Sequence, residues 1–263
     1  MKHPNSTESR ILSATDLESL QKQALDAVAE VGLLGGLAYN QEPKFLAGDI
    51  THPYDKAAHH RLVQRLKVTG LPVLSEEDLK AYRLAQIPEG QFWLIDPIDG
   101  TYNLWRGLDF VATSVALMDG VSPILGVIKN LNTGDIFQGG IGIGPSRNNV
   151  SLSVSSTSNL SRAVLATGFP VGSDRSKFID GLAATRLEHI GKVRMFGSAA
   201  LSLCLLAEGK VDAYWEQGIF LWDVAAGIAV AKAAGANISM TPHRKSFRLD
   251  VLVNTPELAM FLE

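Results

Sequence analysis

The segment WLIDPIDGT, residues 93–101, constrains this chain more than any other, because it sets Asp96 and Asp99 three residues apart after an apolar strand. We expect Pro97, which has no N–H, to stop the strand ladder and Gly100 to permit a sharp turn. Two carboxylates this close repel each other and have raised pKa values unless a cation lies between them. The segment therefore indicates a divalent metal site, and Mg²⁺ suits oxygen-only ligands best. A simple turn is the alternative interpretation, because Asp, Pro and Gly are common turn formers.

The composition describes a globular chain that can carry such a site. Its 263 residues are 46% hydrophobic and 19% charged, and its net charge of −3 provides no broad basic field for nucleic acid. The single cysteine, Cys204, excludes an internal disulfide and agrees with a reducing compartment. The polar start MKHPNSTESR lacks the apolar core of a secretory signal, and the apolar stretches are too short to cross a bilayer. We therefore expect a cytoplasmic protein with no membrane or nucleic-acid partner.

Apolar periodicity divides the chain into two halves. In the first half it predicts a helix over residues 17–31 capped by Asp16, a second helix opened by Asp55, and a short strand over residues 71–74. Strands over residues 111–118, 124–129 and 135–141 are separated by Asp-Gly and Thr-Gly pairs, which indicates an antiparallel sheet. The paired glycines near residue 140 resemble a dinucleotide loop, but Pro145 follows them, so a hairpin end is the interpretation.

The second half alternates strands and helices. The predicted strands are Val164–Ala166, Val193–Phe196 and Val211–Trp215, and the predicted helices are Lys177–Ile190, Ser198–Glu208 and Asp223–Ala234. Gly, Pro, Ser and Asn cluster at residues 145–150. The sequence therefore predicts an N-terminal α+β metal-binding half, residues 1–147, and a C-terminal α/β half, residues 148–263.

Further acids lie where strands or loops meet helices. Glu76 and Glu77 follow the strand over residues 71–74, and Asp55 and Asp223 each begin a predicted helix. Taken singly, the two aspartates are interpreted as helix caps and the glutamate pair as a solvated surface. Their combination with Asp96 favours a shared metal site.

Three motifs in order resemble the inositol monophosphatase family: SEE at residues 75–77, DPIDGT at residues 96–101 and WDVAAG at residues 222–227. The similarity runs from about Lys44 to about Ala234 and includes GDITHPYD, FGSAA and DAYWEQGIFLWD. The resemblance implies a mixed α+β and α/β fold, a layered α-β-α-β-α sandwich in which an antiparallel N-terminal sheet packs against the α/β half. It also implies a homodimer and a lithium-sensitive, Mg²⁺-dependent phosphatase.

The resemblance assigns roles to individual positions. Two or three Mg²⁺ ions would be bound by Glu76, Asp96, the Ile98 carbonyl, Asp99 and Asp223. The implied catalytic residues are Glu76, Thr101 and Asp55, of which Thr101 and Asp55 would orient the attacking water. The implied substrate-binding residues are Glu76, Ile98, Asp99, Gly100, Thr101, Gly197, Ser198, Ala199, Glu216 and Asp223. Lys44 would lie on a mobile metal-binding loop.

The chemistry of the residues agrees with this assignment. Hydrolysis of a phosphate monoester needs roughly 20 kcal/mol of barrier lowering, and the sequence shows no arginine cluster to supply it. Bound Mg²⁺ would neutralise the phosphate and activate water, so no phosphoenzyme is expected. The expected substrate is a small polyol phosphate, with inositol monophosphate the first choice. A 3′(2′),5′-bisphosphate nucleotidase, a histidinol-phosphatase and a fructose-1,6-bisphosphatase remain alternatives, and a non-catalytic scaffold is disfavoured because every expected ligand is present.

Several positions depart from the family pattern. The usual DLVTxxD is DITHPYD here, which makes Asp55 less secure than Asp96. His59 and His60 replace a common Ala-Glu and are interpreted as surface residues without an assigned role. Ser75 stands where monophosphatases more often have Gly, whereas Asn103 favours a monophosphatase. Cys204 lies in an apolar helix and is interpreted as a structural thiol.

Overall fold

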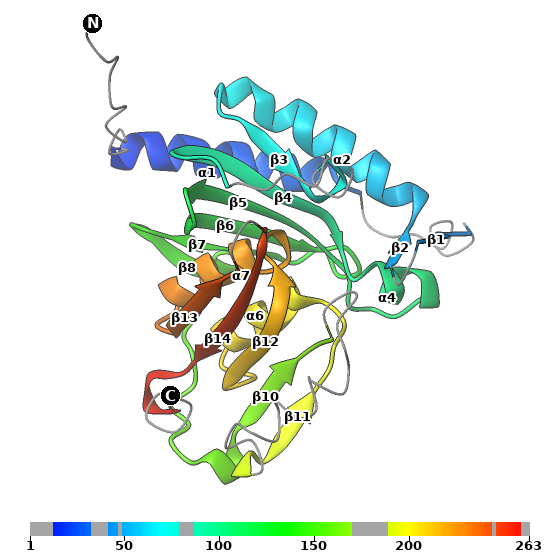
Figure 1. Ribbon diagram of the computed structural model, residues 1–263. Coiled ribbons are helices and arrows are strands. Elements are labelled where there is room, and N and C mark those ends of the chain that lie inside the picture. Colours follow the sequence, from blue (N-terminus) through cyan, green and yellow to red (C-terminus); the bar gives the residue numbers. More distant parts are fainter. Residues whose placement is uncertain are drawn as a thin grey trace, which may run out of the picture.

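The computed structural model describes residues 13–32, 42–46, 49–78, 87–169, 189–243 and 246–258. In these residues two helices, a seven-stranded sheet, two further helices and a five-stranded sheet lie on one another as layers (Figure 1). This arrangement confirms the predicted mixed fold class and its antiparallel first sheet. The helix predicted over residues 177–190, which would add to the fifth layer, falls almost entirely outside the described residues.

The seven-stranded sheet follows the chain in order. Its strands are β3 (Val73–Ser75), β4 (Gln91–Asp99), β5 (Ala112–Asp119), β6 (Ser122–Asn130), β7 (Ile136–Gly140), β8 (Ile143–Arg147) and β9 (Val150–Ser151). Only β3 and β4 are parallel, and the remaining neighbours are joined as antiparallel pairs. The glycines near residue 140 lie in the β7–β8 hairpin, as expected from the sequence.

Helices α1 (Ala14–Glu30) and α2 (Pro53–Leu66) pack against one face of this sheet. Their apolar residues form a core with the sheet residues on that side, including the fully buried Trp93. The predicted helices are confirmed, but the predicted cap of the first was wrong. Ser13 is the N-cap, and Asp16 is the third helical residue that completes a capping box with it. A side-chain acceptor and an acid three residues later satisfy two free N–H groups together.

Strand β4 continues beyond Pro97 through a β-bulge, so the prediction that this proline ends the strand was wrong. Asp96 pairs with Ser114 and Asp99 pairs with Ala112, so β4 advances three residues while β5 advances two. Pro97 has no N–H to donate, and the bulge is a place where the ladder does not need one. In a regular strand, residues three apart point to opposite faces. The extra residue of the bulge lets Asp96 and Asp99 point to the same side of the sheet.

The five-stranded sheet has the order β11-β10-β12-β14-β13. Its strands are β10 (Val164–Thr167), β11 (Lys192–Arg194), β12 (Ala213–Phe220), β13 (Asn237–Pro242) and β14 (Arg248–Asn254). Strand β10 is parallel to β11 and β12, which confirms the α/β alternation of this half. The antiparallel pairs β12–β14 and β13–β14 were not predicted.

Helices α6 (Ala199–Ala207) and α7 (Leu221–Ala233) lie between the two sheets and are buried along nearly their whole length. The small residues of WDVAAG allow α7 to approach the first sheet closely. At Gly126 in β6, an added Cβ atom would lie 2.0 Å from the carbonyl oxygen of Ala226. A glycine in the strand is therefore required where the helix backbone passes. This contact fixes the depth of the helix that carries Asp223.

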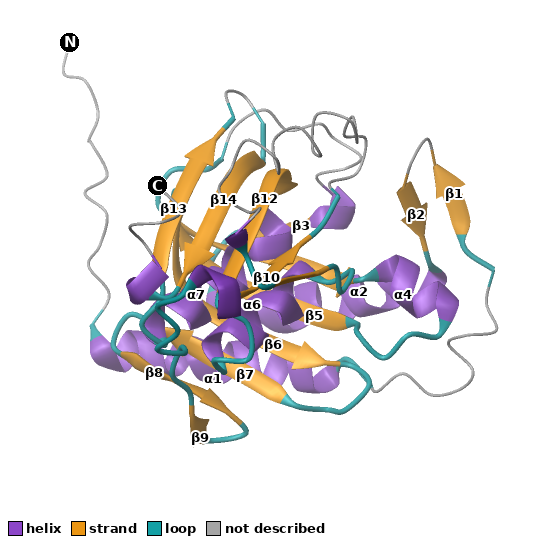
Figure 2. Cartoon of the chain, turned by 90° about the horizontal axis from the view of Figure 1, so that it is seen from below, coloured by secondary structure: helices purple, strands orange, loops and turns teal. Residues whose placement is uncertain are grey.

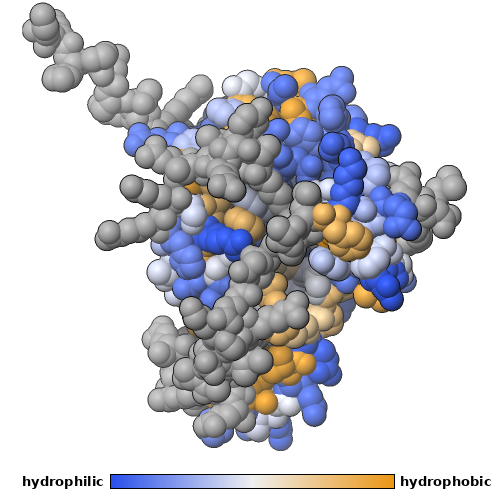
Figure 3. Space-filling view, turned by 45° about the vertical axis from the view of Figure 1, so that its right-hand side comes forward, coloured by the Kyte–Doolittle hydropathy of each residue, from blue (hydrophilic) through white to orange (hydrophobic). Residues whose placement is uncertain are grey.

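The shorter elements lie at the edges of these layers. They are the hairpin of β1 (Lys44–Leu46) and β2 (Asp49–Thr51), the helix α4 (Thr101–Arg106), and the 3₁₀ turns η2 (Lys67–Thr69), η3 (Leu160–Arg162) and η5 (Pro256–Leu258). The hairpin stands beside α4, away from the two main sheets (Figure 2). The described helices include none with the length and apolarity needed to span a membrane. On the face shown in Figure 3, hydrophilic residues alternate with separate hydrophobic areas.

The division of the chain at residue 147 stays a prediction. Strand β9 carries the first sheet on to Ser151, and the second sheet begins at Val164 in β10. One buried core cluster joins residues from both sheets through α6 and α7. The two halves therefore share the layer of helices that separates their sheets.

Candidate active site

A cavity of about 240 Å³ opens where β4 leaves the seven-stranded sheet. Its walls come from β2, β4, α4, the start of α7 and three connecting segments. The residues that line it are Ile50, Glu76, Asp96, Ile98, Asp99, Gly100, Thr101, Tyr102, Phe169, Gly197, Phe220 and Asp223. Four carboxylates from three distant parts of the chain therefore face one space.

Asp96 is the most deeply buried of these acids, with 1% of its surface exposed. Its Oδ1 accepts a hydrogen bond of 3.0 Å from the backbone N–H of Ile98, which closes the bulge. Burial raises the pKa of Asp96 well above its usual value, and the nearby charges of Glu76, Asp99 and Asp223 raise it further. The position is costly for an ionised carboxylate unless a positive charge compensates it.

Asp99 is held by the beginning of α6. Its Oδ2 accepts hydrogen bonds from the Ser198 hydroxyl at 2.5 Å and from the backbone N–H of Ala200 at 2.7 Å, and its Oδ1 accepts from the Ala199 N–H at 3.3 Å. Burial raises the pKa of Asp99 to about 6, although these three donors act in the opposite direction. The same Ser198 hydroxyl accepts from Leu201 N and so caps α6. One side chain thus joins the acid to the helix start.

The turn after Asp99 has a shape that requires glycine. Gly100 has φ +94°, and a Cβ atom there would lie 2.8 Å from the Phe110 carbonyl oxygen. The Thr101 hydroxyl donates to the Ile98 carbonyl at 3.1 Å. Asn103 donates from Nδ2 to the carbonyls of Phe110 and Phe196, both at 2.8 Å. These bonds tie the DGT turn to the FGSA segment that precedes α6.

The other two acids enter the cavity from element ends. Glu76 directly follows β3, where the parallel pairing places Ser75 beside Ile95 of β4. Asp223 lies in the first turn of α7, whose N-cap is Phe220 and which begins at Leu221. An acid in the first turn is favoured by the helix dipole. Because α7 begins at Leu221, Asp223 is the third residue of its helix, as Asp55 is of α2. The interpretation of these two aspartates as N-caps was therefore wrong.

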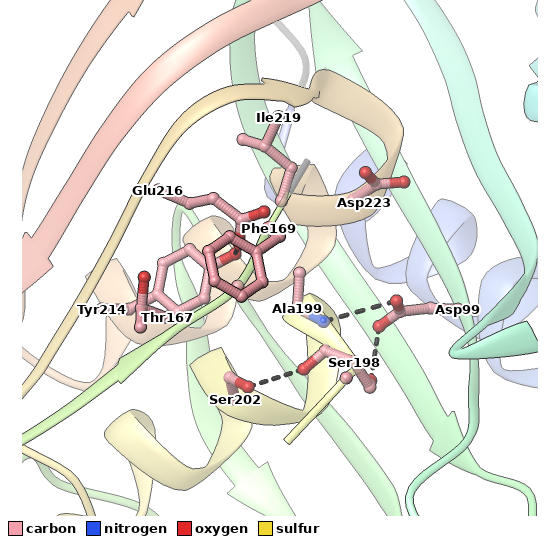
Figure 4. Close-up of a pocket in the computed structure, with 12 residues that line it drawn as sticks. Asp99, Thr167, Phe169, Ser198, Ala199, Ser202, Tyr214, Glu216, Ile219 and Asp223 are labelled. Atoms are coloured by element: carbon pink, nitrogen blue, oxygen red, sulfur yellow. Dashed lines mark hydrogen bonds between the residues drawn. The ribbon is translucent and has the colours of Figure 1, made fainter. Parts of the chain in front are cut away.

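A second cavity of about 150 Å³ adjoins the first and shares Asp99, Phe169, Gly197 and Asp223 with it. In Figure 4, Asp99, Ser198 and Ala199 form one side, and Glu216, Tyr214 and Phe169 lie across from them. The Tyr214 hydroxyl donates to Glu216 Oε2 at 2.7 Å. Burial raises the pKa of Glu216 to about 7, and this hydrogen bond lowers it in part.

The structure brings most of the sequence-predicted residues together. The first cavity contains Glu76, Asp96, Ile98, Asp99, Gly100, Thr101, Gly197 and Asp223, and the second adds Ser198, Ala199 and Glu216. The described lining of neither cavity includes Asp55, which accepts from His52 N at 2.6 Å in the capping box of α2. Lys44 lies in the β1–β2 hairpin. The assigned roles stay predictions.

The interpretation of His59 as a surface residue was wrong, because only 15% of its side chain is exposed. His60 is exposed and bonds to the Lys56 carbonyl of its own helix. Cys204 is buried in α6, and burial raises the pKa of its thiol well above the usual value. An inert structural thiol fits this position.

The donor set of the first cavity fits a hard divalent cation. Carboxylate and carbonyl oxygens are the ligands that Mg²⁺ prefers, and the buried acids need a cation to be ionised together. Among the residues that the structure describes, no three His, Cys, Asp or Glu side chains converge closely enough to hold one ion as they stand. Asp99 accepts hydrogen bonds from the start of α6, and Asp96 accepts one from the Ile98 N–H and interacts with Glu76. Binding of one ion would therefore need the acids of this cavity to come closer together.

Sequence reasoning missed Thr167, Phe169 and Tyr214. Thr167 ends β10, and its hydroxyl donates to the Trp215 carbonyl at 2.6 Å. Tyr214 precedes Glu216 by two positions in β12, so the alternation of a strand places both on one face. That periodicity was available from the sequence. The contribution of β10 depends on the pairing of β10 with β12, which the sequence does not specify.

Comparison with known proteins identifies the family. A profile of the inositol monophosphatase family matches residues 16–258. An inositol-1-monophosphatase of Synechocystis is 32% identical over 243 residues, which cover 89% of this chain and 83% of that protein. Inositol monophosphatase 1 of Bos taurus is 33% identical over 174 residues, covering 64% of this chain and 62% of that protein.

Solved structures agree with the sequence relatives. The extragenic suppressor protein SuhB of Bartonella henselae superposes with a TM-score of 0.77 at 25% identity, covering 92% of this chain and 96% of that one. An inositol monophosphatase from Anabaena superposes with a TM-score of 0.71 at 26% identity, covering 92% and 93% of the two chains. The chain therefore belongs to the inositol monophosphatase family, a family of phosphate monoester hydrolases.

Proposed function

We propose that this enzyme hydrolyses the phosphate monoester of a small polyol, with inositol monophosphate as the first candidate, and that the reaction depends on Mg²⁺. The observation that carries the proposal is the convergence of Glu76, Asp96, Asp99 and Asp223 on one cavity beside the turn that contains Thr101. Family membership supports phosphatase activity of this type.

In this proposal the four acids and the Ile98 carbonyl hold the metal. Bound there, two or three Mg²⁺ ions would supply positive charge to the phosphate and to the departing alkoxide, and would make water acidic enough to attack. The cost of burying Asp96 beside three other acids supports this assignment, because a cation would offset it. The carboxylates are then occupied as ligands, so water attacks phosphorus directly and no aspartyl phosphate forms.

The protein groups around the acids position the reactants. The Thr101 hydroxyl is anchored on the Ile98 carbonyl and would orient the attacking water. Asp99, Gly100 and Thr101 line the same cavity, and the backbone N–H groups of this turn would bind phosphate oxygens. Asp55 would assist from the start of α2. Its capping bond to His52 fixes its orientation there.

The second cavity favours a polyol as the leaving group. Its four side-chain hydroxyls all donate to protein acceptors: Thr167 to Trp215 O, Ser198 to Asp99, Ser202 to Ser198 O and Tyr214 to Glu216. Because a hydroxyl has one proton, these groups offer a ligand only lone pairs. The described lining also contains the carboxylates of Glu216 and Asp223 and no Lys or Arg. Such a wall suits the O–H donors of a polyol and disfavours a second phosphate.

A phosphate-release assay tests the proposal. The substrates are inositol 1-phosphate, histidinol phosphate, fructose 1,6-bisphosphate and 3′-phosphoadenosine 5′-phosphate, each with Mg²⁺ and with chelator. We expect the highest kcat/KM for inositol 1-phosphate and no turnover without Mg²⁺. Preference for either bisphosphate would contradict the role of the second cavity, and full activity in chelator would contradict the metal assignment. Trapping of a covalent aspartyl phosphate would contradict direct attack by water.

Two further properties belong to the same proposal by family resemblance. Li⁺ should inhibit the enzyme, which the same assay measures. The chain should form a homodimer, which analytical ultracentrifugation measures directly. A monomer at all concentrations would contradict the second expectation without affecting the proposed chemistry.

A further inference from the structure

His59 is a residue of α2, the helix that carries Asp55, and its ring contacts the segment around Glu76. Its Nδ1 is 2.8 Å from the Ser75 hydroxyl, and its Nε2 is 4.0 Å from Asp78 Oδ1. Ser75 precedes Glu76 and Asp78 follows it by two positions, so the imidazole contacts the chain on both sides of this acid. Ser75 is fully buried, with no exposed surface.

A single protonation form of the imidazole serves both contacts. Burial lowers the pKa of His59, which favours the neutral ring at pH 7. With the ring proton on Nε2, Nδ1 accepts a hydrogen bond from the Ser75 hydroxyl while the N–H faces the Asp78 carboxylate. The contact with Ser75 is therefore a complete hydrogen bond between two side chains sheltered from water.

The contact also connects the parts of the site that the backbone leaves separate. His59 is one helical turn after Asp55, and residues four apart lie on the same face of a helix. Ser75 is paired with Ile95 in β4, immediately before Asp96. The hydrogen bond thus ties α2 to the β3–β4 pair at the level where the acids emerge.

We propose that His59 is a positioning residue, which fixes the Glu76 turn against α2 through the Ser75 hydroxyl and so sets the place of Glu76 in the metal site. The proposal rests on the function proposed above, because Glu76 is a metal ligand only there. His59 acts through Ser75 and touches no reacting atom. It is absent from the described lining of both cavities.

Four variants test this role, with His60 as the matched control. His59→Ala and Ser75→Ala remove either partner of the hydrogen bond, and the double variant removes both. His59→Asn places an amide where Nδ1 was and can restore the bond. His60→Ala changes the neighbouring histidine, whose described hydrogen bond goes to the Lys56 carbonyl of its own helix and whose ring lies edge-on to that of His59 at 5.4 Å between centroids, so this control keeps the bond to Ser75 and removes the ring contact. Mg²⁺ binding to chelator-treated protein is measured by titration calorimetry, and melting temperature is measured on the same samples.

We expect His59→Ala and Ser75→Ala each to weaken Mg²⁺ binding about fivefold, the factor that one neutral hydrogen bond typically contributes. The double variant should lose no more than either single variant, because both remove one interaction. His59→Asn should restore most of the affinity, and His60→Ala should match the wild type.

Wild-type affinity in His59→Ala would overturn the positioning role. An equal loss in His60→Ala, or no recovery in His59→Asn, would also overturn it, because the effect would then reflect general loosening of α2. If the wild-type protein binds no Mg²⁺, the proposed function itself fails, and the role of His59 falls with it. A wild type that binds Mg²⁺ with an unaffected His59→Ala refutes this inference alone.

Discussion

The buried acids make a specific prediction about stability and pH. Burial raises the pKa of Asp99 from 3.8 to about 6 and that of Glu216 from 4.5 to about 7, and it raises the pKa of Asp96 strongly. A carboxyl group whose pKa is higher in the folded state binds more protons there than in the unfolded chain. The folded state therefore loses stability as pH rises through the interval between the two values.

The size of this effect follows from the shifts. The change in pKa of Asp99, and likewise that of Glu216, corresponds to a loss of about 3 kcal/mol in the free energy of unfolding once the group is ionised. One kcal/mol moves the melting temperature of a chain of this size by about 2–4 °C. The metal-free protein should therefore melt on the order of 10 °C lower at pH 7.5 than at pH 4.5. Arg147 lowers the pKa of Asp135 from 3.8 to about 2, so the stabilising contribution of Asp135 is lost only at pH values below both of these.

The assay is differential scanning fluorimetry of chelator-treated protein between pH 4.5 and 7.5, with and without Mg²⁺. Mg²⁺ should raise the melting temperature strongly at pH 7.5 and hardly at pH 4.5, because it binds the ionised acids. The isosteric variant Asp99→Asn should show a smaller pH dependence and a smaller response to Mg²⁺. A metal-free protein that gains stability from pH 4.5 to 7.5, or equal stabilisation by Mg²⁺ at both values, would refute the reasoning.

Four further substitutions and one control test the site and the packing around it. Asp96→Asn or Asp223→Asn should lower kcat/KM on the order of 1000-fold with unchanged circular dichroism, and near-wild-type turnover would refute the ligand assignment. Ser198→Ala removes the donor to Asp99 and the cap of α6, so urea unfolding should show a free energy of unfolding lower by about 2 kcal/mol or more. An unchanged free energy of unfolding would show that neither bond stabilises the protein. Gly126→Ala places a Cβ atom 2.0 Å from the Ala226 carbonyl oxygen and should lower the free energy of unfolding by about 3 kcal/mol or more. The control Gly144→Ala, whose Cβ atom would have nothing within 4 Å, should change it little. Equal melting temperatures of the two variants would contradict the packing of α7.

Local patterns in the sequence specified most of the elements but not their exact ends. Alternating apolar residues and the Asp-Gly and Thr-Gly pairs were sufficient for the β5–β6–β7 meander, because those strands are joined by short hairpins. The course of β4 beyond Pro97 was not predictable in the same way. Whether a proline ends a strand or lies in a bulge depends on the register of the neighbouring strand, which is set by tertiary pairing.

The candidate site followed from motifs rather than from periodicity. Three motifs in order identified Glu76, Asp96, Asp99 and Asp223, and all four line one cavity, whereas Asp55 is outside its described lining. His59 was misjudged because a helix pattern does not reveal which neighbour covers a given face. Thr167 was missed because its place beside Trp215 depends on the parallel pairing of β10 with β12, which brings residues 48 positions apart together.

The central claim is that Glu76, Asp96, Asp99 and Asp223 together bind divalent ions that the reaction requires. A crystal grown with Mn²⁺ in place of Mg²⁺ allows the ions to be located by their anomalous scattering. We predict two or three peaks in the cavity beside the Gly100 turn, each coordinated by oxygens of these acids or of Ile98. An active enzyme whose crystals show no ion among these carboxylates would contradict the account.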